Sequence, residues 1–440
     1  MSRYFGTDGV RGRAGEGKLS DDRLRDLGAA LAAFVGAGGS VAIGRDTRLS
    51  GPNMAGILRT SLTGGGVNVH DLGIVPTPAT ALLTQTLGAD LGIMITASHN
   101  PWHDNGVKLF GPDGRKLADV AQTAIEGSLG RSSEVGSATG AVTEETHAPD
   151  DYVRHVVRAV GGSPLNGLSV VADAANGAAY HVLPEVLRQL GATVHAIGTS
   201  TDGRVINDGV GSNNPDAVAA AIGEHGADVG VAVDGDADRI VMVDRHGQLA
   251  DGDQIMARLA SDMAEDGTIE GGAVVATVMS NLGLERHVEA LGLRFERTAV
   301  GDRHVAKRMG EIGANLGGEA SGHILLTDHA MTGDGTLSAA LLLAGLAKSG
   351  LPSDKYLRAF EPVPQRLVNV RYDGSSPLER TDVQDAIASE HAAIAGQGRI
   401  LVRASGTEPL IRVMVEGDDA SVVSQVADKL SGIIAAAAKN

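Results

Sequence analysis

Short runs of apolar residues alternate with stretches of helical length through most of the chain. The apolar runs that predict strands are 41–44, 68–74, 91–96, 169–173, 193–197, 229–234 and 273–278. Strands that alternate with helices are typical of βαβ units, in which helices cover a largely parallel sheet. The pattern therefore predicts an α/β fold for the larger part of the chain.

An internal repeat organises these strands. GADLGIMITASHNP (88–101) aligns with GADVGVAVDGDADR (226–239) and, more loosely, with GANLGGEASGH (313–323). Two further aligned sets precede them, at 40–48, 169–177 and 273–283, and at 66–74, 191–199 and 292–300. Three strands that recur three times in the same order predict three similar mixed α/β domains. We expect these domains at residues 1–150, 151–253 and 254–362.

The end of the chain follows another pattern. In the segment 398–419 two predicted strands enclose a polar loop, and an Ala-rich helix completes the chain. We therefore expect a smaller C-terminal α+β domain at residues 363–440. Ligands of open parallel sheets bind beyond the carboxyl ends of the strands. Because the polar loops follow such strand ends, the four domains are expected to surround a central cleft.

Composition and charge exclude several classes of protein. The 440 residues include 37 Lys+Arg and 54 Asp+Glu, a formal net charge of -17, and only 2% are aromatic. Such a chain is a poor partner for nucleic acid. The lack of cysteine excludes disulfides, thiolate catalysis and Cys-bound metals. No apolar run reaches the ~18 residues of a membrane helix, and the N-terminus lacks a signal region. We expect a cytoplasmic protein without a nucleic-acid or membrane partner.

The segment DGDADR places Asp234, Asp236 and Asp238 at alternate positions directly after an apolar strand. Carboxylate oxygens are the preferred ligands of Mg²⁺ and Ca²⁺, so the triplet indicates a site for one hard cation. An EF-hand loop is excluded because Arg239 and Arg245 stand where Gly and Glu are required. A solvated acidic turn is the alternative for the triplet taken alone.

Ser98 lies in TASHNP (96–101), in the loop that aligns with the three aspartates, with His99 next to it and Lys108 ten residues on. A serine becomes a nucleophile where a nearby charge or metal stabilises its alkoxide or holds its phosphate. On residue types alone, a turn that caps the following segment is favoured. The alignment of the two loops favours the other interpretation, in which Ser98 and the metal face each other.

Two more polar loops suggest a sugar phosphate. GEASGH (318–323) offers Glu319, Ser321 and His323, whose spacing suits the vicinal hydroxyls of a sugar, although an ordinary loop is equally consistent. RASGTEP (403–409) combines a guanidinium, two hydroxyls and backbone N–H groups, at Arg403, Ser405, Gly406 and Thr407. These groups can form a phosphate cradle, and a hairpin turn is the alternative. Arg11, in FGTDGVRG, is a weaker candidate.

Taken together, the motifs indicate phosphoryl transfer. Nucleotide sites are disfavoured because the chain has no Gly-Lys-Ser/Thr motif and no GxGxxG after a strand. A serine, a hard cation, a sugar site and a phosphate cradle remain. A metal-dependent serine phosphatase and a non-catalytic sugar-phosphate binder are the alternatives, but the binder has no need of a serine beside three aspartates.

With TASHNP, DGDADR, GEASGH and RASGTEP in this order, the sequence resembles the α-D-phosphohexomutases over essentially its whole length. FGTDGVRG, DNGVK (104–108) and VGDRHV (300–305) are most similar to the bacterial phosphoglucosamine mutases, with phosphomannomutases and phosphoglucomutases as the alternative. The resemblance implies an isomerase with a phosphosugar substrate, Mg²⁺ and a glucosamine 1,6-bisphosphate intermediate, in the synthesis of peptidoglycan precursors. It also suggests a homodimer, and it leaves the priming of the serine open.

The same resemblance implies roles for the motif residues. Ser98 would be the phosphoserine, and a phosphate oxygen on it would bind Mg²⁺ together with Asp234, Asp236 and Asp238. Lys108 matches the candidate acid or base, with His99 and Arg11 close to the chemistry. The substrate would be held by Glu319, Ser321, Arg239, Arg403, Ser405, Gly406 and Thr407. Two positions depart from the subgroup: Ala320 stands where Gln is usual, and His304 where Tyr is common.

Overall fold

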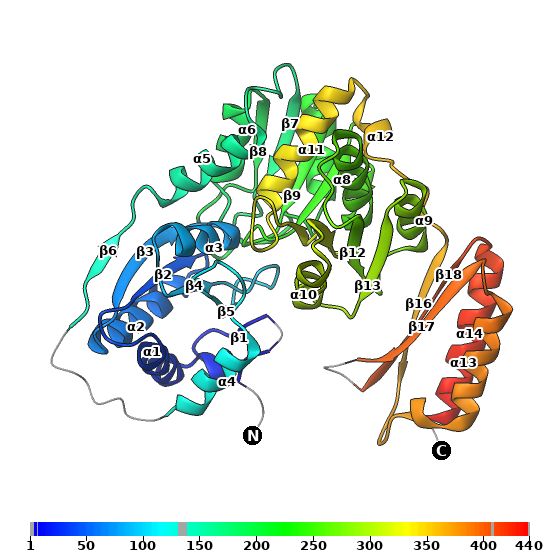
Figure 1. The fold of residues 1–440 in the computed structure, drawn as a ribbon, viewed down its shortest axis with the longest axis horizontal. Coiled ribbons are helices and arrows are strands. Elements are labelled where there is room, and N and C mark those ends of the chain that lie inside the picture. The colour runs from blue at the N-terminus through cyan, green and yellow to red at the C-terminus, as the bar shows by residue number, and fades with distance from the viewer. Residues whose placement is uncertain (1–3, 7, 131–138, 406–408, 439–440) are drawn as a thin grey trace.

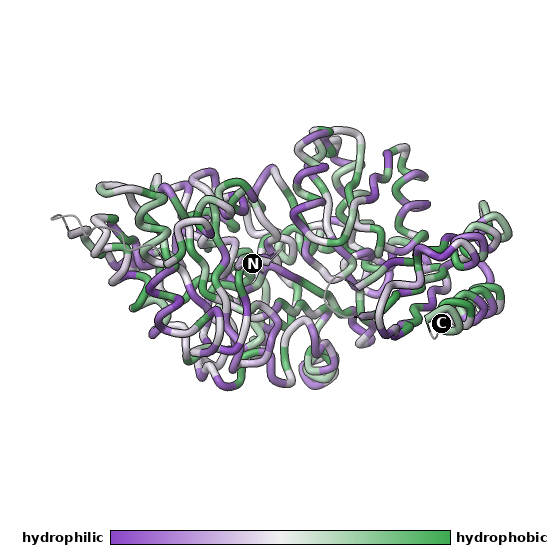
Figure 2. Tube along the Cα trace, turned by 90° about the horizontal axis from the view of Figure 1, so that it is seen from below, coloured by the Kyte–Doolittle hydropathy of each residue, from purple (hydrophilic) through white to green (hydrophobic). Residues whose placement is uncertain are grey.

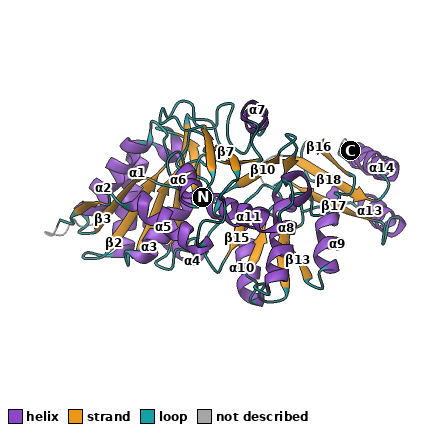
Figure 3. Cartoon of the chain, turned by 90° about the horizontal axis from the view of Figure 1, so that it is seen from above, coloured by secondary structure: helices purple, strands orange, loops and turns teal. Residues whose placement is uncertain are grey.

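The computed structural model describes residues 4–6, 8–130, 139–405 and 409–438. These residues form four sheets with their helices, which follow one another along an arc from the N-terminus to the C-terminus (Figure 1). The helices α13 (Thr381–Ala393) and α14 (Ala420–Ala437) lie beside the last sheet, at the C-terminal end of the molecule (Figure 3). The predicted division into three mixed α/β domains and a smaller α+β domain is confirmed.

The first sheet has the strand order β1-β5-β4-β2-β3-β6. Its strands are β1 (Val10–Arg13), β2 (Ser40–Arg45), β3 (Asn68–Ile74), β4 (Leu91–Ile95), β5 (Asp104–Phe110) and β6 (Val142–Glu144). A short 3-10 turn (Gly17–Leu19) and four helices accompany it, namely α1 (Asp21–Val35), α2 (Gly51–Gly64), α3 (Thr77–Thr86) and α4 (Asp119–Ser128).

The second sheet has the order β11-β10-β9-β7-β8. Its strands are β7 (Ser169–Asp173), β8 (Thr193–Ile197), β9 (Val229–Val233), β10 (Ile240–Asp244) and β11 (Leu249–Ala250). Its helices are α5 (Ala148–Val160), α6 (Val182–Gln189) and α7 (Asp216–His225).

The third sheet has the order β13-β12-β14-β15. Its strands are β12 (Ala273–Thr277), β13 (Arg294–Thr298), β14 (Leu316–Gly318) and β15 (Ile324–Leu326). The helices of this part are α8 (Gly252–Asp266), α9 (Leu282–Ala290), α10 (Asp302–Ile312), α11 (Gly335–Ser349) and α12 (Ser353–Tyr356).

The fourth sheet is antiparallel, with the order β16-β18-β17. It consists of β16 (Gln365–Arg371), β17 (Gly398–Ala404) and β18 (Leu410–Gly417). A 3-10 turn (Pro377–Glu379), α13 (Thr381–Ala393) and the C-terminal α14 (Ala420–Ala437) complete this domain.

The first three sheets share one topology, which is the structural form of the sequence repeat. Their common parts are β3-β2-β4-β5, β8-β7-β9-β10 and β13-β12-β14-β15. In each, three parallel strands are followed by an antiparallel fourth. The polar loops at 96–103, 234–239 and 319–323 are the connections into that fourth strand. They therefore lie at equivalent strand ends.

One core of buried apolar side chains extends through the first three domains, from Leu72 of β3 through Val231 of β9 to Val274 of β12, and Leu343 of α11 belongs to it. The first domain has a further core, which includes Val41 of β2 and Leu58 of α2. The C-terminal domain has a core of its own, which includes Val413 of β18 and Leu430 of α14. Apolar and polar segments alternate closely along the trace (Figure 2), and no described helix is long and apolar enough to cross a membrane.

Candidate functional site

The serine loop follows β4, a strand buried on both faces between helices. Ser98 is completely buried and adopts the left-handed backbone conformation, with φ 53°. Its hydroxyl donates to Asp234 Oδ2 over 2.5 Å and lies 3.3 Å from His99 Nδ1. A non-glycine residue in this conformation is uncommon and is found where the surroundings hold it in place. The loop is thus built to direct the Ser98 hydroxyl toward the second domain.

The aspartate loop follows β9 at the equivalent position. Asp234, Asp236 and Asp238 are buried, and one carboxylate oxygen from each lies within 4.8 Å of the others. Gly235 allows the two loops to meet, since a Cβ there would lie 2.6 Å from the carbonyl oxygen of Ser98. The structure therefore brings together the serine and all three aspartates.

Lys108, on β5, fills the space between the carboxylates. Its Nζ donates to Asp236 Oδ2 and Asp238 Oδ2, each over 2.7 Å, and lies 3.4 Å from Asp8. Burial by itself lowers the pKa of Lys108, but the adjacent carboxylates outweigh this and raise it well above the ordinary lysine value. Lys108 is therefore a buried ammonium group at neutral pH.

The donor set suits a hard divalent cation. Asp236 Oδ1 is buried and has no hydrogen-bond partner. Burial, followed by repulsion from Asp236 and Asp238, raises the pKa of Asp234 to about 8. A bound cation would give Asp236 Oδ1 a partner and would relieve the repulsion among the three carboxyl groups. Carboxylate oxygens in such an arrangement could hold Mg²⁺.

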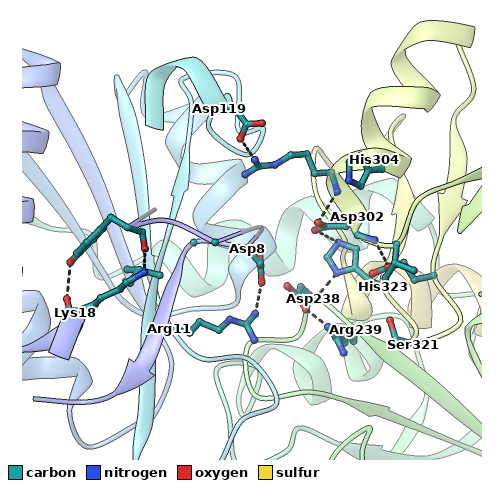
Figure 4. A pocket seen from close by; sticks show the side chains of 18 residues that line it. Asp8, Arg11, Lys18, Asp119, Asp238, Arg239, Asp302, His304, Ser321 and His323 are labelled. Atoms are coloured by element: carbon teal, nitrogen blue, oxygen red, sulfur yellow. Dashed lines mark hydrogen bonds and ion pairs between the residues drawn. The ribbon is translucent and has the colours of Figure 1, made fainter. Parts of the chain in front are cut away.

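A cleft of about 750 Å³ opens beside the three aspartates and is lined by all of the first three domains. Predicted site residues that line it include Arg11, Arg239, Glu319, Ser321 and His323. Asp238 lines it too, which connects the cleft with the aspartate loop (Figure 4). Glu319 is oriented by the N–H of Gly301, which donates to its Oε1 over 3.0 Å.

His99 is adjacent to this chemistry. Burial is the main reason that its pKa falls to about 4, and the cations of Arg239 and Arg11 lower it further. The imidazole is therefore neutral at physiological pH. It is available as a proton acceptor beside Ser98.

A chain of ion pairs beside the cleft was not predicted. Lys116 bonds to both Asp8 and Asp302. Asp302 lies 3.2 Å from His323 Nε2, and both of these residues line the cleft (Figure 4). Burial lowers the pKa of His323, but Asp238 and Asp302 outweigh it and raise the pKa above its ordinary value. Asp8 and Asp302 belong to FGTDGVRG and VGDRHV, so these two motifs were the signal that could have identified them.

The described residues of the fourth predicted loop, 403–405 and 409, do not line this cleft. No described residue of the C-terminal domain lines it, and Arg403 Nη2 lies instead 4.0 Å from Met279 Sδ in the third domain. Arg399 holds the C-terminal domain there by donating to the carbonyls of Val278 (2.9 Å) and Ser280 (3.1 Å). Among the described residues, the aspartate loop and the GEASGH loop line the cleft, whereas the described parts of the serine loop and of the RASGTEP loop do not. Gly406 and Thr407 lie outside the described residues, and Ser405 is the last described residue before them.

Four family models match consecutive parts of the chain. They describe the phosphoglucomutase/phosphomannomutase α/β/α domain I at residues 2–135, domain II at 150–247, domain III at 251–363 and the C-terminal domain at 367–433.

Curated relatives are similar over the full length. A phosphoglucosamine mutase of Novosphingobium aromaticivorans is 50% identical over 444 residues, 99% of each chain. One of Paracoccus denitrificans is 50% identical over 456 residues, 100% of each chain.

Solved structures share the fold. A phosphoglucomutase/phosphomannomutase family protein of Burkholderia thailandensis matches with a TM-score of 0.83 and 26% identity, over 99% of this chain and 97% of the other. The N-acetylphosphoglucosamine mutase of Aspergillus fumigatus in complex with GlcNAc-6P and magnesium matches with a TM-score of 0.62 and 20% identity, over 90% and 82%.

Proposed function

The chain belongs to the α-D-phosphohexomutases and, within them, to the bacterial phosphoglucosamine mutases, and from this premise we propose how it interconverts glucosamine 6-phosphate and glucosamine 1-phosphate. Ser98 carries the transferred phosphoryl group, and glucosamine 1,6-bisphosphate is the intermediate. The observation that supports this assignment is the contact of the Ser98 hydroxyl with Asp234, next to Asp236, Asp238 and Lys108.

In the first half-reaction the sugar O1 attacks the phosphorus on phospho-Ser98. The O1–P bond forms and the bond from phosphorus to Ser98 Oγ breaks, while neutral His99, whose Nδ1 lies 3.3 Å from Oγ, accepts the proton of the sugar hydroxyl and passes it to the departing Oγ. The bisphosphate then turns over. Oγ attacks the 6-phosphate, and His99 accepts the Oγ proton and passes it to the departing sugar O6, which yields phospho-Ser98 and glucosamine 1-phosphate. A neutral imidazole is suited to this acceptor role.

Charge is the main demand of such a transfer, since catalysis of phosphoryl transfer is largely positioning and electrostatics. Asp234, Asp236 and Asp238 would hold Mg²⁺, which offsets the charge of the phosphoryl oxygens when it is bound. Lys108 contributes a fixed ammonium group at the same place. Arg11 and Arg239 face the cleft and would hold anionic parts of the substrate.

The remaining residues bind the sugar phosphate. Glu319 and Ser321 would contact the sugar hydroxyls. Arg403, Ser405, Gly406 and Thr407 would hold the phosphate that is not reacting, in both orientations of the intermediate. This requires the C-terminal domain to approach the cleft. We further propose domain limits at 1–150, 151–253, 254–362 and 363–440, and a cytoplasmic role in making UDP-N-acetylglucosamine.

A mutase assay tests the proposal. Glucosamine 6-phosphate, glucose 6-phosphate and mannose 6-phosphate are compared in the presence of Mg²⁺ and a trace of the matching 1,6-bisphosphate, while free phosphate is monitored. We expect a strong preference for the amino sugar, no turnover by Ser98→Ala, and loss of the Mg²⁺ response in Asp236→Asn. Full activity of Ser98→Ala, or phosphate release without isomerisation, would contradict the scheme.

A further inference from the structure

The carbonyl groups of the serine loop are held by a buried guanidinium. Arg48 is completely buried, and its Nη2 donates to the carbonyls of Ser98 (2.9 Å) and Asn100 (2.7 Å). Its Nη1 donates to the carbonyls of Pro101 (2.5 Å) and Asp104 (2.9 Å). Arg48 therefore fixes the loop from within the first domain.

A second donor reaches the same carbonyls from the second domain. Asn207 lies in the connection between β8 and α7, and its Nδ2 donates to the carbonyls of Ser98 (2.9 Å) and Asn100 (3.2 Å). Its own backbone is left-handed, with φ 59°, and its N–H donates to Ala175 over 2.8 Å. The Asn207 amide is thus aimed at the serine loop by a fixed backbone.

The amide end of Ser98 is held as well. Its N–H donates to Thr96 Oγ1 over 2.8 Å, and the Thr96 hydroxyl donates to Asp46 Oδ2 over 2.7 Å. Asp46 also accepts from Arg48 Nε over 2.9 Å. Both peptide groups of Ser98 are therefore constrained, which is how a disfavoured left-handed backbone persists. The direction of the Ser98 side chain follows from these two peptide orientations.

We propose that Asn207 is a positioning residue, whose amide holds the Ser98 carbonyl from the second domain and so keeps the reactive hydroxyl aligned with the aspartates of that same domain. Asn207 makes this link across the domain boundary, whereas Arg48 acts inside the first domain. The proposal rests on the proposed role of Ser98 as phosphoryl carrier. Asn207 acts through the loop, without forming or breaking a bond itself.

Two substitutions distinguish the contribution of the Asn207 side-chain amide from that of its left-handed backbone conformation. Asn207→Asp keeps the shape and tolerates the left-handed conformation, but it replaces the N–H donor by an oxygen that faces two carbonyls. Asn207→Gly favours the left-handed conformation and removes the side chain. The matched control is Asn214→Asp in the same connection, because the Asn214 amide also donates to two carbonyls, those of Asn207 (3.3 Å) and Val210 (3.1 Å), but does not touch the serine loop.

The experiment measures kcat and KM for glucosamine 6-phosphate, and the single-turnover rate at which glucose 1,6-bisphosphate phosphorylates Ser98, followed by intact mass. We expect both Asn207 variants to lose kcat and the phosphorylation rate by about 10- to 100-fold, because small displacements of a reacting group have effects of this size. KM should change less than about threefold, and thermal unfolding should match that of the control within a few degrees.

Each outcome has a separate meaning. Wild-type chain without mutase activity, or an active Ser98→Ala variant, would overturn the proposed function. If the wild type is active and Ser98→Ala is not, equal rates in Asn207→Asp and Asn214→Asp would overturn the positioning role. A rise in KM with an unchanged kcat in the Asn207 variants would also overturn the positioning role.

Discussion

Replacing Lys108 by Met would test whether this ammonium group compensates the acidic site. Its Nζ lies 2.7 Å from Asp236 and Asp238, and its side chain is 2% exposed. Removing one partner of a buried ion pair leaves an uncompensated charge and typically costs about 3–5 kcal/mol. Met retains most of the side-chain volume, so packing changes little. We expect Lys108→Met to be destabilised by roughly that amount in the absence of divalent cations.

The assay is denaturant unfolding in EDTA and again in millimolar Mg²⁺. The control is Lys348→Met, because Lys348 pairs with Asp266 while its side chain is 63% exposed, and solvent-exposed ion pairs contribute little to stability. Mg²⁺ should stabilise Lys108→Met more than the wild type, because in the variant no ammonium group pairs with the carboxylates of Asp236 and Asp238 that bind the cation. If Lys108→Met is as stable in EDTA as the control, or gains no more from Mg²⁺ than the wild type, the reasoning is refuted.

Two further predictions concern buried positions near the site and the domain junction. Burial, followed by the negative charge of Asp251, raises the pKa of Asp253 to about 7. The free energy of unfolding should therefore fall as pH rises from about 4 to about 7, because the unfolded chain releases this proton at lower pH than the folded chain. Asp253→Asn should remove this pH dependence and be more stable than the wild type by up to roughly 4 kcal/mol at pH 8. A pH series of unfolding curves measures it, and a difference that does not vary with pH would contradict it. Gly235→Ala would put a Cβ 2.6 Å from the Ser98 carbonyl oxygen and 2.8 Å from Asn207 Nδ2. We expect it to lower kcat at least tenfold and to destabilise by about 1–3 kcal/mol; unchanged kcat with unchanged unfolding would show that the two loops separate freely.

The repeated part of the fold could be predicted because its central strands are buried on both faces. β4 and β9 are therefore almost entirely apolar, and this makes them visible in the sequence. The antiparallel strands β5, β10 and β15 were not predicted. Each of these strands runs antiparallel because it pairs with the strand directly before it in the chain, β4, β9 or β14. The apolar content of a segment does not specify which strand it pairs with.

The same distinction applies to the site. Ser98 and Asp234 could be predicted as neighbours because both follow equivalent strand ends. Arg48, Asn207 and Lys116 could not, since each is a single polar residue in a connection and bonds to a partner 50, 109 or 186 positions away. The placement of the Arg403 loop depends on contacts between domains, such as those of Arg399 with the third domain, that no local motif encodes.

The apolar cores of the molecule determine which of its parts can be exchanged between relatives. The first three domains share a core, in which side chains such as Leu72, Val231 and Val274 depend on shapes contributed by the other domains. A chimera that imports one of these three from a distant relative would meet mismatched side chains at every shared contact. The C-terminal domain keeps its core to itself, and besides one passage of the chain before β16 it meets the third domain through polar contacts such as those of Arg399 with the carbonyls of Val278 and Ser280. Since these contacts end on backbone carbonyls, which any sequence supplies, recombination at that passage leaves the cores intact, and it is where natural or engineered hybrids of this enzyme should be viable.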